Sequence, residues 1–257
     1  MIHRRGLLIG ALAMMSLPRL GMAATSGAED FRLGVNWGGM HVADVALGFR
    51  ANGAAIDGSM GITSRGMASL LTSYGGEMQS VSRDEAGELR SSHYRAHYES
   101  RRYTRDIEIR YDDAGDPVEV ALFKRGEPQG VDIPKRLWAG TVDPLTGILR
   151  VRRWMVGGNR PDRLVVPIFD GRSRYDIEAT PLEPTDDVAR ARLVVNPLAS
   201  ASRSSWLAGW ENDDGRWIEA KVSNDPRAVP LLIETQDGGT ASSVELDKDC
   251  SNTASCS

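Results

Sequence analysis

Hydrophobic and polar residues alternate along much of the chain, in short runs separated by turn signals. In one run, Ile107, Ile109 and Tyr111 share a face, while Glu108 and Arg110 occupy the other. A period of two residues predicts a β-strand with one buried face. Such runs recur along the sequence, so the chain is expected to be mainly β.

Short turns connect these runs. Asn-Gly and Asp-Gly pairs supply the positive φ angles that tight hairpins require, and they occur at Asn52-Gly53, Asp57-Gly58, Asp113-Ala114-Gly115, Asp170-Gly171, Asp214-Gly215 and Asp237-Gly238. Short connections make consecutive strands antiparallel neighbours. We expect about ten to twelve strands in one long antiparallel meander, which at that length must curl into an open or half barrel.

Two segments have the periodicity of a helix instead. Residues 64–74 place Met67, Leu70, Leu71 and Tyr74 at helical spacing. The second segment is VDPLTGILRVRRW (142–154). We expect one or two short helices on the concave side of the sheet, because an apolar helix face must be buried.

The second segment opens with Asp143 and Pro144, a helix cap followed by the residue that suits the first turn. Leu145, Ile148 and Leu149 then lie on one face. We expect this helix to plug or cover the concave side of the sheet. With Trp154 these residues form a predicted hydrophobic groove or lid: Leu145, Ile148, Leu149 and Trp154.

Basic residues are concentrated around this helix. Between positions 135 and 163 there are seven basic residues and two acids, in a chain whose formal net charge is −4. The favoured interpretation is a solvated surface, and the alternative is a patch that binds lipid headgroups or another anionic ligand. The residues predicted for that patch are Lys135, Arg136, Arg150, Arg152 and Arg153. The acidic balance of the whole chain argues against nucleic-acid binding.

The N-terminus has the layout of a secretory signal peptide. MIHRR is basic, GLLIGALAMMSL is apolar, and GMAA offers a small-residue cleavage site after Ala23. Arg4-Arg5 also permits twin-arginine export, although the Sec route is favoured. We expect the mature chain to lie in the periplasm of a Gram-negative bacterium, without a transmembrane segment.

The two cysteines, Cys250 and Cys256, lie in the last eight residues. In an oxidising compartment they can form a disulfide, which is favoured over free thiols. The expected organisation is a signal peptide (1–23), a flexible segment (24–30), a single curved β domain (31–247) and a flexible tail with both cysteines (248–257).

Candidate catalytic groups are sparse, and we expect no catalytic residue, cofactor or metal site. His93 and His97 are spaced as a helical metal pair would be, but they alternate with Tyr94, Ala96 and Tyr98 as on a strand. On a strand they lie about 13 Å apart, too far to share one ion. His41 and Asp44 lack an identifiable nucleophile, and no Gly-x-Ser-x-Gly elbow occurs.

Four stretches resemble a family of exported bacterial proteins, the domain of unknown function 3108. They are WGGMHVADVALGF, DPLTGILRVRR, IFDGRSRYDIEA and WIEAKVSNDPRAVPLLIE, in that order. The resemblance implies an exported β protein similar in shape to the open barrels of periplasmic lipoprotein carriers. It implies no activity, because the family has none established.

Three hypotheses follow from the sequence. The first is an exported envelope protein that binds or carries a lipid, acyl chain or lipoprotein in an open barrel. The second is a non-catalytic structural or adaptor protein of the periplasm, with a core filled by its own side chains and an envelope protein as partner. A hydrolase ranks third, so the protein is not expected to be an enzyme.

Overall fold

The computed structural model describes residues 27–66, 69, 74–158, 160–185, 187–200, 217–235 and 242–251. Within these residues, fourteen strands form one antiparallel sheet with the order β8-β7-β6-β5-β4-β3-β2-β1-β14-β13-β12-β11-β10-β9. The sheet curls but is not closed, since β8 and β9 are its two edges. The predicted open antiparallel meander is therefore confirmed, with more strands than expected. Strands such as β8 and β14 are mostly polar and show little of the apolar alternation.

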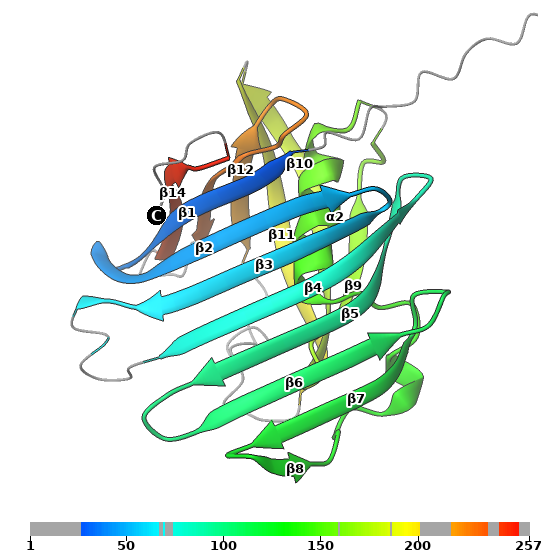
Figure 1. Cartoon of the computed structure of the whole chain (residues 1–257). Helices are drawn as coiled ribbons and strands as arrows, with labels where there is room; N and C mark the ends of the chain where they lie inside the picture. Colours follow the sequence, from blue (N-terminus) through cyan, green and yellow to red (C-terminus); the bar gives the residue numbers. More distant parts are fainter. Residues whose placement is uncertain are drawn as a thin grey trace, which may run out of the picture.

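The elements follow one another in chain order (Figure 1). The strands are β1 (Ala28–Trp37), β2 (Met40–Asn52), β3 (Ala55–Ser64), β4 (Gly75–Glu85), β5 (Glu88–Glu99), β6 (Thr104–Tyr111), β7 (Pro117–Lys124), β8 (Glu127–Gln129), β9 (Leu164–Phe169), β10 (Ser173–Thr185), β11 (Val188–Ser200), β12 (Ile218–Ser223), β13 (Pro230–Thr235) and β14 (Ser242–Asp249). Between β8 and β9 lie the 3-10 helix η1 (Lys135–Leu137) and the helix α2 (Pro144–Val156).

The helix α2 lies inside the curl of the sheet. It contacts β3, β4 and β5 in the first half of the sheet and β9 and β11 in the second. Figure 1 shows it behind β2 to β5, between these strands and the yellow strands β10 and β11. The chain thus builds one half of the sheet, runs through the interior as α2, and returns strand by strand until β14 pairs with β1.

Two apolar clusters flank the helix, one against each half of the sheet. Leu145 and Leu149 belong to the cluster formed mainly by β1 to β7. Val151, Trp154 and Met155 belong to the cluster formed mainly by β9 to β12. The helix therefore buries side chains in two directions, whereas a single apolar face was expected.

Close packing between helix and sheet explains one wrong turn prediction. Asp57-Gly58 lies inside β3, not in a hairpin turn. A Cβ added to Gly58 would lie 2.7 Å from the Oγ of Ser80 and 3.4 Å from the Cβ of Leu145. Gly58 is thus needed for the close approach of α2 to the strand, a role that a dipeptide turn signal does not reveal.

The other turn signals divide into two groups. Asn52-Gly53, Asp113-Ala114-Gly115 and Asp170-Gly171 connect consecutive strands, and their glycines have φ angles of 64°, 86° and 87°. These predictions are confirmed. Asp214-Gly215 and Asp237-Gly238 lie outside the described residues, as do Met67, Leu70 and Leu71 of the first predicted helix.

The expected boundaries of the domain need correction. β1 begins at Ala28, so residues 28–30 belong to the sheet and not to a flexible segment. β14 runs to Asp249, and the N–H of the buried Cys250 donates to the carbonyl of Asp30 at 2.7 Å. The ends of the domain pair with each other, which orders both. The signal peptide and Cys256 lie outside the described residues, so the signal peptide and the disulfide stay predictions.

Both edges of the sheet are protected against further pairing. β8 has three residues and includes Pro128. On β9, the carbonyl of Pro167 accepts the Val142 N–H at 2.9 Å, and the Phe169 N–H donates to the Val142 carbonyl at 3.0 Å. Short edges and prolines limit edge-to-edge association. No helix among the described residues is long and apolar enough to cross a membrane.

Candidate functional site

The N-terminus of α2 is capped by a fully buried carboxylate. One carboxylate oxygen of Asp143 accepts the N–H groups of Leu145 and Thr146, at 2.9 and 3.0 Å. The other oxygen accepts the hydroxyls of Ser91 and Thr146, both at 2.6 Å. The backbone N–H of Asp143 donates to the Ser91 hydroxyl at 2.9 Å. The predicted cap is confirmed, and it also ties the start of the helix to β5.

Burial raises the pKa of Asp143 above its ordinary value of 3.8, while the hydrogen bonds from Ser91 and Thr146 oppose that shift. A carboxyl group whose pKa is raised in the folded state favours folding fully below its unfolded pKa. This contribution is lost as the pH rises through the folded pKa.

Asp143→Asn is therefore expected to change the pH dependence of stability. Asparagine is about as good a helix cap as aspartate, so the two proteins should be similar near pH 4. As the pH rises toward 7, the wild type should lose stability relative to the variant. Urea unfolding of both proteins over this range measures the difference, and a difference that is constant or has the opposite slope would refute the assignment.

The four residues of the predicted groove or lid do not form an open surface. Leu145 has no exposed area, Leu149 and Trp154 are buried, and Ile148 is half-buried. The indole N–H of Trp154 donates to the Pro161 carbonyl at 3.1 Å. They pack inside the core on two sides of α2, with Leu145, Ile148 and Leu149 in one apolar cluster and Trp154 in the other.

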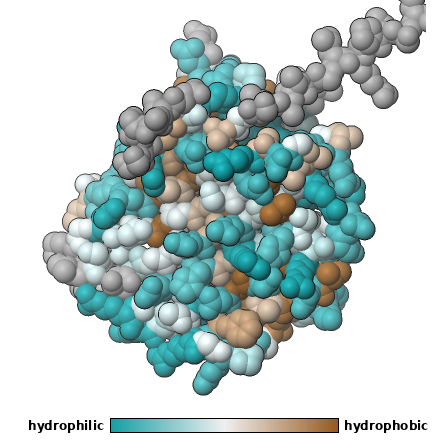
Figure 2. Space-filling view, in the orientation of Figure 1, coloured by the Kyte–Doolittle hydropathy of each residue, from teal (hydrophilic) through white to brown (hydrophobic). Residues whose placement is uncertain are grey.

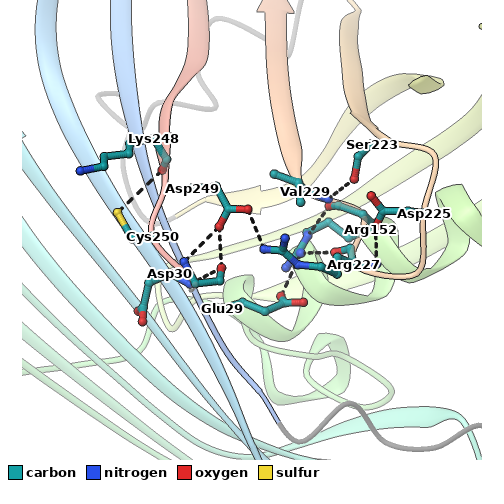
Figure 3. A network of polar contacts seen from close by, with 12 residues as sticks. Glu29, Asp30, Arg152, Ser223, Asp225, Arg227, Val229, Lys248, Asp249 and Cys250 are labelled. Atoms are coloured by element: carbon teal, nitrogen blue, oxygen red, sulfur yellow. Dashed lines mark hydrogen bonds and ion pairs between the residues drawn. The ribbon is translucent and has the colours of Figure 1, made fainter. Parts of the chain in front are cut away.

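Arg152 fixes the other end of α2 (Figure 3). The side chain is 5% exposed. Its guanidinium donates to the carbonyls of Ala228 and Arg227, at 3.0 and 2.7 Å, and to the Glu29 carboxylate at 2.9 Å. It also lies 5.1 Å from the ring centroid of Phe31, within cation–π distance. Arg152 is thus unavailable to an anionic ligand, and its prediction as part of a surface patch is wrong.

The carbonyl groups that Arg152 binds belong to the turn between β12 and β13. The Asp225 carboxylate accepts the Arg227 N–H at 2.7 Å, which stabilises this turn. The Arg227 side chain donates to Asp249 of β14 at 2.7 Å (Figure 3). Through these contacts α2 is connected to the strands on both sides of the β1–β14 pairing.

The remaining residues of the predicted anionic-ligand patch have separate partners. Arg150 donates through Nε to the Leu89 carbonyl at 2.9 Å. Arg153 forms an ion pair with Asp84 at 2.5 Å. On η1, the Lys135 ammonium lies 5.7 Å from the Trp138 ring centroid, and Arg136 is exposed. The five residues do not assemble into one basic surface.

The described histidines lie on strands and pair with carboxylates. His93 and His97 lie on β5 as expected, and they contact Glu108 at 3.0 Å and Asp106 at 2.6 Å across the β5–β6 pairing. These side chains belong to the outer face of the sheet, which Figure 2 shows as largely hydrophilic. Among the described residues, no group of three or more His, Cys, Asp or Glu side chains is arranged to hold a metal ion.

His41 contacts Asp44 at 2.7 Å, and the same carboxylate accepts the Arg65 Nε at 2.5 Å. The hydrogen bond from Arg65 is the main reason that the pKa of Asp44 is lowered from its ordinary value. His41 and Asp44 are therefore adjacent, but they belong to an exposed ion-pair cluster with Arg65.

A second set of polar side chains lies at one end of the concave face, and we call it the tyrosine–arginine cluster: Tyr74, Tyr98, Tyr103, Arg105 and Arg172. The rings of Tyr74 and Tyr98 stack with centroids 6.3 Å apart. The Arg105 guanidinium lies 4.9 Å from the Tyr103 ring centroid. Tyr98 and Arg105 are direct cross-strand partners of β5 and β6. Arg172 comes from the turn between β9 and β10.

This cluster was not predicted, although one signal for it was present. Arg105 has the same strand parity as Ile107, Ile109 and Tyr111, which are buried. Extending the alternation by one step would have placed an arginine on the inward face. The contribution of Arg172 could not have been predicted, because its turn meets β6 only through the curl of the whole sheet.

Comparisons with known proteins identify a family. A family model described as "Protein of unknown function (DUF3108)" matches residues 33–241. The chain is also similar to the crystal structure of a beta-barrel-like protein of domain of unknown function DUF1849 from Brucella abortus. The TM-score is 0.49 with 11% sequence identity, covering 86% of this chain and 95% of that chain. No curated protein matches the chain.

Proposed function

Since the chain belongs to the DUF3108 family of proteins of unknown function, whose name assigns no activity, we propose a role from its own packing. We propose that it is an exported, non-catalytic structural or adaptor protein of the cell envelope, with its interior filled by its own helix. The N-terminal signal pattern supports export to the periplasm.

One observation carries the proposal: α2 is buried on both sides and anchored at both ends. Asp143 binds Ser91 of β5, and Arg152 binds the β12–β13 turn and Glu29 of β1. A lid over a lipid site would need to separate from the sheet, and a separated α2 would leave both a carboxylate and a guanidinium without partners. Separation would also return the buried Leu145 and Leu149 to water, at a cost of about 1.5–3 kcal/mol for each side chain.

The surface offers features that suit an adaptor. The β1–β2 hairpin presents Trp37 and Met40, each 57% exposed, on either side of Gly38 and Gly39. Tryptophan and methionine are enriched in protein–protein interfaces. An envelope protein that contacts this hairpin is the kind of partner that the proposal expects.

Native mass spectrometry of protein purified from periplasm without detergent tests the proposal. We expect the mass of the processed chain alone, with no acyl species in a lipid extract and no uptake of added fatty acid. A stoichiometric acyl ligand that copurifies would contradict it and would support a lipid or lipoprotein carrier instead. A lipid-binding carrier protein in the same experiment provides the positive control.

A further inference from the structure

The tyrosine–arginine cluster is built on the inward face of the sheet, where charged side chains are rare. Arg105 points to the same side of β6 as the buried Ile107 and Ile109. Its cross-strand neighbours are Tyr98 on β5 and Lys124 on β7. Three tyrosines and three cations are therefore placed at one end of the concave side.

These cations form no ion pair with a carboxylate, whereas about half of the arginines of the described chain do. Arg65, Arg90, Arg153, Arg163, Arg190 and Arg227, among others, form ion pairs. In the part of the chain that the structure describes, no carboxylate lies within ion-pair distance of Arg105, Lys124 or Arg172. Positive charge is thus gathered there without an ion pair to a described carboxylate, and the nearby charge of Asp170 acts on Arg172 from a longer distance.

Two carboxylates, those of Asp170 and Glu127, lie near these cations but form no ion pair with them. The Asp170 carboxylate accepts the backbone N–H groups of Arg172 and Ser173, at 2.8 and 2.6 Å, so it stabilises the turn that carries Arg172. Glu127 of β8 is the cross-strand neighbour of Lys124, and the two form no ion pair. Neither carboxylate bridges the two arginines.

The arrangement costs stability in the unliganded protein. Burial, followed by the nearby positive charge of Arg172, lowers the pKa of Arg105, which means that the folded state disfavours its charge. Burial also raises the pKa of Tyr74 and of Tyr98, so both hydroxyls stay protonated and can donate hydrogen bonds. An anion between the arginines would offset the repulsion and accept those hydrogen bonds.

We propose that the tyrosine–arginine cluster, together with Lys124, is a binding site for a phosphate-bearing ligand. The two guanidinium groups match the geometry of phosphate oxygens, which they bind through paired N–H donors. Three cations suit the charge of about −1.5 to −2 of a phosphate monoester at neutral pH better than the single charge of a carboxylate. The tyrosine rings contact the group that carries the phosphate.

Isothermal titration of the mature protein with inorganic phosphate and with glycerol 3-phosphate, at constant ionic strength, tests the site. We expect saturable binding of glycerol 3-phosphate. Arg105→Gln and, as a second variant on another element, Arg172→Gln should each weaken it about tenfold or more. Arg110→Gln is the matched control, because it removes an arginine from the outer face of the same strand.

A readout without ligand separates this site from a structural role. If the arginines serve only the fold, Arg105→Gln should lower the melting temperature. The proposed site predicts an unchanged or higher melting temperature for this variant, because it removes an uncompensated charge. Equal loss of binding in Arg110→Gln would overturn the proposal. A wild type that binds neither phosphate saturably and does not bind to phosphatidic acid vesicles would also overturn it.

Vesicles identify the source of the phosphate. Sedimentation with vesicles of phosphatidylcholine alone, and of phosphatidylcholine with phosphatidic acid, separates a lipid headgroup from a soluble phosphate ester. Binding to the phosphatidic acid vesicles that depends on Arg105 supports a lipid headgroup. Binding of glycerol 3-phosphate without vesicle binding supports a soluble ligand.

Discussion

Leu145→Asp is expected to prevent folding, and Leu145→Ala to lower the free energy of unfolding by about 3–5 kcal/mol. Leu145 has no exposed area, and its Cβ packs against β3 at Gly58, where a Cβ would lie 3.4 Å away. The cavity left by alanine cannot collapse easily, because the helix is held at both ends. Urea unfolding followed by circular dichroism measures the change.

Ile148→Ala is the matched control, since Ile148 lies on the same helix and is half-buried. We expect a loss of about 1 kcal/mol for it, because less apolar area is returned to water. If α2 were a lid outside the core, Leu145→Ala would leave the urea midpoint of the sheet unchanged. That outcome would refute the placement of the helix in the interior.

Arg152→Met is expected to lower the free energy of unfolding by about 3 kcal/mol. The substitution keeps much of the side-chain volume but removes the donors to the carbonyls of Arg227 and Ala228 and to Glu29. Burial lowers the pKa of Arg152, so keeping its charge inside already costs free energy, and the expected loss lies at the low end for a buried charged group.

Arg153→Met is the control for this prediction. Arg153 follows Arg152 in the helix, but its pair with Asp84 is partly exposed, and exposed pairs contribute about 0–1 kcal/mol. A sheet-spanning connection through Arg152 requires the two variants to differ clearly in unfolding free energy. Equal, small losses would show that the contacts of Arg152 do not hold the helix in place.

Much of the fold could be predicted from local signals. The alternation around Ile107 and Ile109 predicted a strand, and Asp143-Pro144 predicted the start of the helix, because a cap and the first turn depend on neighbouring residues only. The curl of the sheet followed from the number of strands and the lack of long crossovers. These features depend on spacing along a few residues.

The environment of α2 could not be predicted in the same way. Thr146, Gly147 and Arg152 interrupt the apolar pattern, so the helix looked amphipathic, yet all three are buried. The Thr146 hydroxyl donates to Asp143 in the same turn, whereas Gly147 and Arg152 are accommodated by residues distant in sequence. Gly147 has room for no Cβ, because one would lie 2.6 Å from Ile168 Cδ1, and Arg152 binds Glu29 of β1. Such pairings exist only once the sheet has curled around the helix.

The candidate sites also depend on contacts that local sequence does not reveal. The basic residues near α2 formed a cluster in sequence, but the structure directs Arg150, Arg152 and Arg153 to different partners. Arg105 and Arg172, which form no ion pair among the described residues, are far apart in sequence and meet through the fold. Counting charges in a window is therefore a weak guide to an anion site on a curved sheet.

Native-state hydrogen exchange of the α2 amides, residues 147–154, tests the central claim most directly. If α2 is an integral part of the core, these amides should exchange only through global unfolding, with the same protection free energy as the central strands β1 and β2. Exchange of α2 orders of magnitude faster than that of the strands would show that the helix opens separately. It would contradict the account and restore the interpretation of α2 as a lid.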